Sequence, residues 1–339
     1  IAAANHPKIR LFNVPGHVAK PEPEKDPRGQ WQICSPKTIP GFSAVGYYFG
    51  RKLQKELNVP IGLVGTNWGG TRIEPWTPPV GFKSVPNLKD YVENLDAVAK
   101  ARAEGKKANP KGGAVQIYNG MVHALTPLSA RGAIWYQGES NAGRGTASSY
   151  EELLGCMVAD WRQRWGHDLS FYWVQLANFR EPTMEPGAES DWVVVQDEMR
   201  RALKSIPKSG MAVINDIGDA RDIHPKNKHD VGERLARWAL VQDYGKKDIV
   251  ISGPLYSGME KRDGKIVVSF DHAAGLKARD GKALQRFEIA GADGKWQWAQ
   301  AKIDGEKIAI WHDAIKNPKL VTAIKQFAEC VGADPEVSF

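Results

Sequence analysis

Short apolar runs alternate with helical repeats along the first two thirds of the chain. Four runs of bulky apolar residues, too short for helices, predict buried strands at 61–65, 133–136, 171–174 and 211–216. Other apolar residues recur every three or four positions and predict helices, which carry Phe42, Val45, Phe49 and Leu53; Leu88, Tyr91, Leu95 and Val98; Tyr150, Leu153, Met157 and Trp161; Val195, Met199 and Leu203; and Val231, Leu235 and Trp238. This alternation is typical of a parallel sheet with helices on both faces.

The pattern changes beyond about residue 247. Asp-Gly pairs, which are strong hairpin signals, occur at 263–264, 280–281, 293–294 and 304–305. They separate short strands predicted at 265–270, 286–290, 295–299 and 307–311. We therefore expect an α/β domain at 1–246 and a β-rich antiparallel domain at 247–339, whose residues 320–339 form an amphipathic stretch.

A candidate acid–base pair follows the last predicted strand of the α/β domain. Asp222 and His224 lie between that strand and the next helix, for which Asn227 is a possible N-cap. In open α/β sheets, catalytic groups collect beyond the carboxyl ends of the strands. Because an Asp can orient an imidazole that takes a proton from a hydroxyl, this position favours hydrolytic chemistry for Asp222 and His224.

Two other strand ends carry groups that could stabilise negative charge. Gly69 and Gly70 follow strand 61–65, and consecutive glycines can present backbone N–H groups to an oxyanion. Gln137 follows strand 133–136 and could donate its side-chain amide to the same oxyanion. The glycine pair by itself is equally consistent with a plain tight turn, so the prediction depends on the three loops together.

No serine in the sequence is predicted to be the nucleophile. Gly138-Glu139-Ser140 is similar to the Gly-x-Ser-x-Gly elbow, but Ala142 replaces its second glycine, which favours a loop or capping role for Ser140. Ser43 lies on a predicted helix and is interpreted as structural.

Several longer motifs, in order, resemble the sialate O-acetylesterase group of the SGNH hydrolases. They lie at 41–45, 68–76, 118–121, 135–141 and 222–228, within a resemblance that runs from residue 1 to about residue 318. The resemblance implies a three-layer α/β/α fold and removal of acetyl groups from sugars through a serine acyl-enzyme, without a cofactor. It assigns His224 as base, Asp222 as its acid, and Gly69, Gly70 and Gln137 as oxyanion donors. Asn67, Arg72 and Glu139 become candidates for substrate binding, although a structural salt bridge is the competing interpretation for Arg72 and Glu139.

The chain departs from that family at the nucleophile. There the serine belongs to a Gly-Gln-Ser-Asn-Met block after the first strand, upstream of the segment that corresponds to residues 1–12, and this chain has no such block. We expect the first strand and its serine to lie upstream of Ile1, so that residues 1–339 alone are inactive. The alternative is a noncatalytic glycan-binding protein of the same fold.

The charge and composition of the chain limit the classes of molecule that it is expected to bind. The net charge is +7, but Lys and Arg are scattered among acids, which argues against nucleic acid. The sequence lacks Cys-x-x-Cys, His-Glu-x-x-His and any apolar run of the ~18 residues that a membrane helix needs, so neither a metal site nor a membrane span is expected. One disulfide among Cys34, Cys156 and Cys330 is possible.

The expected partner is an acetylated carbohydrate, either sialic acid or a plant or algal glycan, while the oligomeric state stays open. The resemblance implies an extracytoplasmic bacterial protein, periplasmic or secreted.

Overall fold

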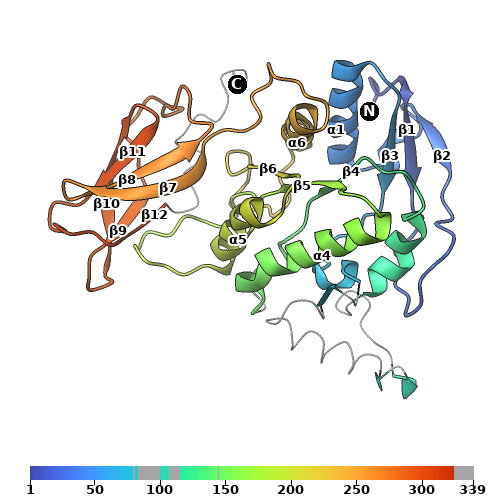
Figure 1. Ribbon diagram of the computed structural model, residues 1–339, viewed down its shortest axis with the longest axis horizontal. Coiled ribbons are helices and arrows are strands. Elements are labelled where there is room, and N and C mark those ends of the chain that lie inside the picture. The colour runs from blue at the N-terminus through green and yellow to red at the C-terminus, as the bar shows by residue number, and fades with distance from the viewer. Residues whose placement is uncertain (79–80, 83–99, 102, 107–114, 144, 324–339) are drawn as a thin grey trace.

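The computed structural model describes residues 1–78, 81–82, 100–101, 103–106, 115–143 and 145–323 (Figure 1). Its strands are β1 His6–Asn13, β2 Trp31–Cys34, β3 Ile61–Gly65, β4 Gly132–Trp135, β5 Ser170–Val174, β6 Ser209–Ala212, β7 Leu255–Arg262, β8 Lys265–Asp271, β9 Phe287–Ala290, β10 Trp296–Asp304, β11 Lys307–Trp311 and β12 Leu320–Ala323. Its longer helices are α1 Ala44–Leu57, α4 Tyr150–Trp165, α5 Asp191–Ser205 and α6 Lys228–Gln242. Short helical turns lie at Ile39–Gly41, Glu74–Trp76, Tyr118–Val122, His123–Leu125 and Ala147–Ser149. The helix predicted from Leu88 to Val98 lies outside these ranges.

Two three-stranded sheets carry the α/β part. Strands β4, β5 and β6 are parallel, with Trp135 opposite Trp173 and Tyr172 opposite Gly210. In the second sheet β1 is parallel to β3 and antiparallel to the edge strand β2. All five residues of β5 are buried, as expected for a central strand that is covered on both faces. The predicted strand at 211–216 is shorter than expected, because β6 ends at Ala212.

Helices cover both faces of these strands (Figure 1). Helices α1 and α6 pack against each other on one face, where Val45 and Leu235 surround Tyr172 of β5. Helices α4 and α5 cover the other face, where Trp161 and Met199 pack with buried strand residues. Asn227 is the N-cap of α6 as predicted, and its Oδ1 accepts the Asp230 N–H at 3.1 Å. Ser43, predicted to lie on the first helix, is the N-cap of α1, and its Oγ accepts the Gly46 N–H at 3.1 Å.

The two sheets share these covering layers. Phe49 of α1 and Ile61 of β3 pack against both apolar clusters under α1, and on the opposite face Phe12 of β1 belongs to the same cluster as Trp135 of β4. The two sheets therefore lie in one layer, although β3 and β4 do not pair with each other (Figure 1). Among the residues that the structure describes, however, no strand pairs with the second edge of β3 or with the outer edge of β4.

The C-terminal sheet is antiparallel, with the order β12-β9-β10-β11-β8-β7. Strands β8 to β11 confirm the four strands predicted from the Asp-Gly pattern, and Ile266, Phe287 and Ile308 form part of their core. Strand β12 occupies the first four residues of the stretch predicted to be amphipathic, and 324–339 lie outside the described residues. The domain boundary at residue 246 stays a prediction.

Two further sequence expectations concern thiols and membranes. Cys34 and Cys156 are free and buried in different apolar clusters, while Cys330 lies outside the described ranges. Within those ranges, no helix combines the length and apolarity needed to cross a membrane.

Candidate active site

The loops after β3, β4 and β6 meet at the carboxyl ends of the strands. The loop after β6 places Asp222 beside His224, and Asp222 Oδ1 accepts the backbone N–H of His224 at 2.9 Å. The two side chains lie 3.9 Å apart between Oδ1 and Nδ1, too far for a hydrogen bond. The His224 side chain is 80% exposed. The predicted pair is thus adjacent, and its imidazole is open to an incoming hydroxyl group.

Glu139, from the loop after β4, lies close to this pair. Burial raises the pKa of the Glu139 carboxyl, and the charges of His224 and Lys228 oppose that shift. Burial lowers the pKa of Lys228, the first residue of α6, while Glu139 and Asp222 oppose that change. The Lys228 ammonium also lies 5.0 Å from the centre of the Tyr136 ring. Two acids and two bases therefore share the space beyond β4 and β6.

A buried ion pair anchors the loop that carries His224. The Arg234 guanidinium of α6 donates to both carboxylate oxygens of Asp216 at 2.6 Å and to the Val213 carbonyl at 2.7 Å. Arg279, from the C-terminal part of the chain, donates to the same carboxylate at 3.1 Å. Burial tends to raise the pKa of Asp216, but the hydrogen bonds and charge of the two arginines outweigh it, and the pKa is lowered.

Replacing Asp216 by asparagine is expected to lower the free energy of unfolding at pH 7 by about 2 kcal/mol, because it leaves two arginines with a neutral partner. A lowered pKa in the folded state means that the ionised carboxylate stabilises the fold above about pH 4 and that this contribution is lost as the pH falls further. Urea unfolding of wild type and variant from pH 3 to pH 8 should therefore give curves that converge at the acid end. A difference in the free energy of unfolding between wild type and variant that is constant with pH would contradict the role of the Asp216 charge.

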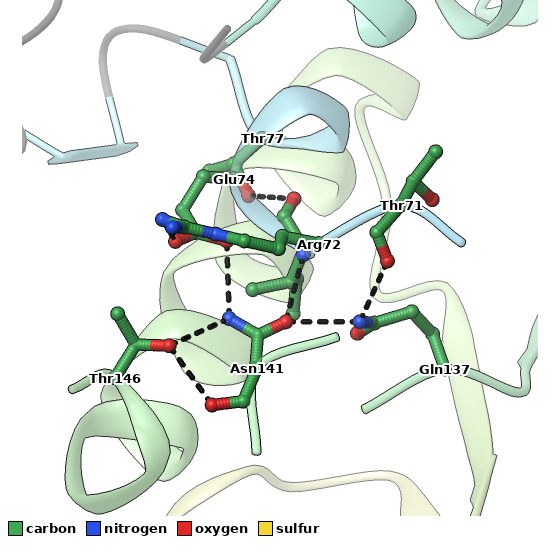
Figure 2. A network of polar contacts seen from close by, with 8 residues as sticks. Thr71, Arg72, Glu74, Thr77, Gln137, Asn141 and Thr146 are labelled. Atoms are coloured by element: carbon green, nitrogen blue, oxygen red, sulfur yellow. Dashed lines mark hydrogen bonds and ion pairs between the residues drawn. The ribbon is translucent and has the colours of Figure 1, made fainter. Parts of the chain in front are cut away.

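Gln137 joins the loop after β4 to the loop after β3 (Figure 2). Its Nε2 donates to the Thr71 carbonyl at 3.0 Å and to Asn141 Oδ1 at 2.9 Å, and its Oε1 accepts from the Tyr150 hydroxyl at 2.8 Å. Both amide hydrogens are therefore used inside the protein. The oxyanion role expected for Gln137 does not fit this geometry, and the side chain instead holds two loops together.

Asn141 is the centre of this network and has no exposed surface (Figure 2). Its Oδ1 accepts the Ile73 N–H at 3.1 Å in addition to the Gln137 amide. Its Nδ2 donates to Glu74 Oε2 at 3.1 Å and to Thr146 Oγ1 at 3.2 Å. All four hydrogen-bonding positions of this side chain are satisfied. Asn141 was not predicted as a site residue, because two of its partners, Ile73 and Glu74, lie far away in the chain.

Arg72 forms an ion pair with the buried Glu74 (Figure 2). The structural salt bridge that competed with substrate binding for Arg72 is therefore present. Glu139, by contrast, lies close to His224 and Lys228, whose charges affect its pKa.

The glycine turn after β3 is exposed. Gly70 has a φ of +70°, which favours glycine, and space is open where a Cβ of Gly69 or Gly70 would lie. Trp68 fixes the turn from one side, since its ring stacks on His17 with centroids 4.9 Å apart. Asn67 is also exposed. The approach to these backbone groups is thus open, as an oxyanion site requires.

A cavity of about 400 Å³ adjoins the acid–base pair. Ile223, between Asp222 and His224, forms part of its wall, and Glu139 and Ala142 contribute from the loop after β4. The rest of the wall comes from the loop after β5 and the start of α5, including Phe179, Arg180, Glu189, Asp191 and Trp192. From the sequence, the insertion at 179–191 is expected to form a pocket wall, and the cavity confirms this. None of the five residues was predicted individually, because irregular loops carry no periodic signal.

Comparisons with known proteins identify relatives of this chain. The family model described as carbohydrate esterase, sialic acid-specific acetylesterase, matches residues 5–240. The sialate O-acetylesterase of Mus musculus is 30% identical over 302 residues, covering 76% of this chain and 54% of that protein. The human sialate O-acetylesterase is 30% identical over 234 residues, covering 65% of this chain and 42% of that protein. The chain thus spans about half the length of the curated relatives it matches.

A solved structure extends the match. The crystal structure of a carbohydrate acetylesterase from Xanthomonas citri superposes with a TM-score of 0.82 at 36% sequence identity, over 94% of this chain and 68% of that chain. The sequence match, the structural match and the loops at the strand ends lead to one conclusion: this chain belongs to the sialic acid-specific acetylesterase family of carbohydrate esterases.

Proposed function

We propose that this chain carries the acid–base and substrate-binding parts of a carbohydrate O-acetylesterase. The observation that carries the proposal is the exposed His224 imidazole, with Asp222 next to it and a cavity beside it. Family membership supports the reaction class, and the open Gly69-Gly70 turn supplies a place for the oxyanion. The substrate is an acetyl ester on a sugar, and an extracytoplasmic location follows from the resemblance alone.

The proposed reaction is acyl transfer through serine. A serine oxygen attacks the acetyl carbonyl while His224 Nε2 takes its proton, and Asp222 stabilises the imidazolium. The backbone N–H groups of Gly69 or Gly70 donate to the tetrahedral oxyanion. The carbonyl re-forms as the sugar oxygen leaves with the proton from His224. Water, activated by the same imidazole, then releases acetate from the serine.

The serine is proposed to come from a strand outside residues 1–339, seated between β3 and β4. The support is that, among the described strands, none pairs with the second edge of β3 or with the outer edge of β4, beneath shared helix layers. A parallel strand there would end between the Gly69-Gly70 turn and the Glu139 loop, near His224. It would also complete an SGNH-type sheet. Within the described residues no serine hydrogen-bonds the His224 imidazole.

Acetate release from acetylated sugars tests this proposal. The protein expressed from its whole coding sequence is expected to release acetate, and residues 1–339 alone to be about a thousandfold slower or more, as for enzymes without their nucleophile. Equal rates for the two would remove the additional strand from the mechanism. Absence of acetate release from the whole product would instead favour the noncatalytic alternative, a glycan-binding protein that saturates with sugar without turnover.

A further inference from the structure

The cavity beside His224 has an aromatic wall and a polar wall, most of which the acyl-transfer chemistry does not use. Phe179 and Trp192 form the aromatic wall, with ring centroids 5.2 Å apart; Trp192 is buried and supports Phe179, whose half-buried ring is the more accessible of the two. The Trp192 indole donates to the Ala177 carbonyl at 2.8 Å, so its ring is fixed in place. Rigid aromatic rings suit the C–H face of a pyranose, because that face is apolar while the ring edge carries hydroxyls.

The polar wall contains more acids than bases. Glu139, Glu189 and Asp191 contribute carboxylates, and Ser190 contributes a hydroxyl group. Arg180 is the one cationic residue of the cavity wall as the structure describes it. Its guanidinium lies 5.7 Å from the centre of the Phe179 ring. His224 and Lys228 lie close to Glu139 but outside the cavity wall, so Arg180 is the one positive charge in that wall near Glu189 and Asp191 as the structure describes it.

This wall is held in place from outside the α/β part. The Gly187 N–H donates to Glu288 Oε2 of β9 at 3.1 Å, and Arg286 donates to the Thr183 carbonyl at 3.1 Å. At the start of the same loop, the Arg180 N–H donates to the Ala220 carbonyl of the His224 loop at 2.9 Å. A pocket anchored at both ends presents its charges in fixed positions, which is a condition for electrostatic selection among ligands.

We propose that this cavity is the subsite for an uncharged, hydroxyl-rich acetylated sugar and that it disfavours sialic acid. The inference rests on the proposed function and names its substrate class. Ionised carboxylates accept hydrogen bonds from sugar hydroxyls, which are donors. A sialate would bring its own carboxylate towards Glu189 and Asp191, and like charges in a partly enclosed site repel. The volume lies within the usual range of about 300–1,000 Å³ for small-molecule sites.

Two probes of matched chemistry test the selection. Calorimetric titration of the purified protein with an O-acetylated methyl xyloside and with O-acetylated N-acetylneuraminic acid is expected to show at least about tenfold tighter binding of the neutral sugar. The double variant Glu189→Gln, Asp191→Asn should reduce this preference severalfold by improving sialate binding. The variant Glu185→Gln, on the same loop but outside the cavity wall, should leave both affinities unchanged.

The variant Arg180→Ala tests the opposite selection, in which the cavity prefers sialate to the neutral sugar. Tighter binding of sialate, abolished by Arg180→Ala, would overturn the proposal, because the guanidinium would then be a carboxylate receptor. Equal binding of both probes, or binding of neither, would also overturn it. Acetate release by the product of the whole coding sequence separates this result from failure of the esterase proposal: release without the expected preference rejects only the subsite. If neither sugar releases acetate, the function itself is rejected.

Discussion

Replacing His224 by alanine is expected to lower acetate release at least about a thousandfold, as the loss of a general base that also serves as general acid does in other enzymes. The residue is 80% exposed, so its removal leaves no buried group without a partner and should not affect folding. The loss should appear in kcat with little change in KM, because the imidazole moves protons and does not hold the sugar. Rates should be measured on acetylated sugars with the product of the whole coding sequence.

A second histidine provides the control for this variant. His167 is exposed and lies shortly before β5, at the opposite end of the strand from the site, so His167→Ala should retain full activity. Added imidazole should restore part of the activity of His224→Gly, since a small base can enter the open position. Full activity in His224→Ala would end the assignment of the acid–base pair, whatever the behaviour of the other residues.

Replacing Asn141 by alanine is expected to lower the free energy of unfolding by about 4 kcal/mol. The substitution removes four buried hydrogen bonds and leaves the Ile73 N–H and one oxygen of Glu74 without these partners. An unsatisfied buried group costs about 1–3 kcal/mol, which makes the loss larger than the sum of four exposed hydrogen bonds would be. Equilibrium unfolding in guanidinium chloride, fitted with a common m-value, measures the change.

An exposed asparagine gives the comparison for the Asn141 variant. Asn5→Ala, near the start of the chain, should change the free energy of unfolding by less than about 0.5 kcal/mol. Because Asn141 and Gln137 connect the loops after β3 and β4, the Asn141 variant should also lose activity at temperatures where it is folded. A loss below about 1 kcal/mol would mean that water or a rotated side chain replaces the network.

The elements that could be predicted from the sequence are the strands that helices cover and the helices that bury one regular face. Strands β3 to β6 contain apolar runs because helices cover their faces, and α1, α4, α5 and α6 show a periodic buried face because they pack against those strands. Strands β1, β2 and β7 were not predicted. Only Cys34 is buried in β2, and β7 has four half-buried residues followed by four exposed ones, so neither shows an alternation of two faces.

Local and long-range signals also differ in what they predict about the site. Asp222 and His224 could be proposed as a pair because their place after a strand is a property of the local sequence, and their catalytic role stays a prediction. The role of Gln137 could not be predicted, because its amide donates to Thr71 and Asn141, and a separation of 66 positions between Gln137 and Thr71 leaves no sequence pattern that pairs them. The insertion at 179–191 was expected to form a pocket wall, but the parts played by Phe179 and Trp192 were not, since an irregular loop has no repeat to recognise.

The bond between Glu288 of β9 and the Gly187 N–H has an evolutionary consequence. It makes one side of the proposed sugar cavity depend on a sheet that takes no part in the proposed proton transfer. Under that proposal, a substitution in β9 can change which sugar is preferred without changing the acid–base pair. Relatives that differ in sugar preference are then expected to differ in β9 and its neighbours, far from His224 in the chain.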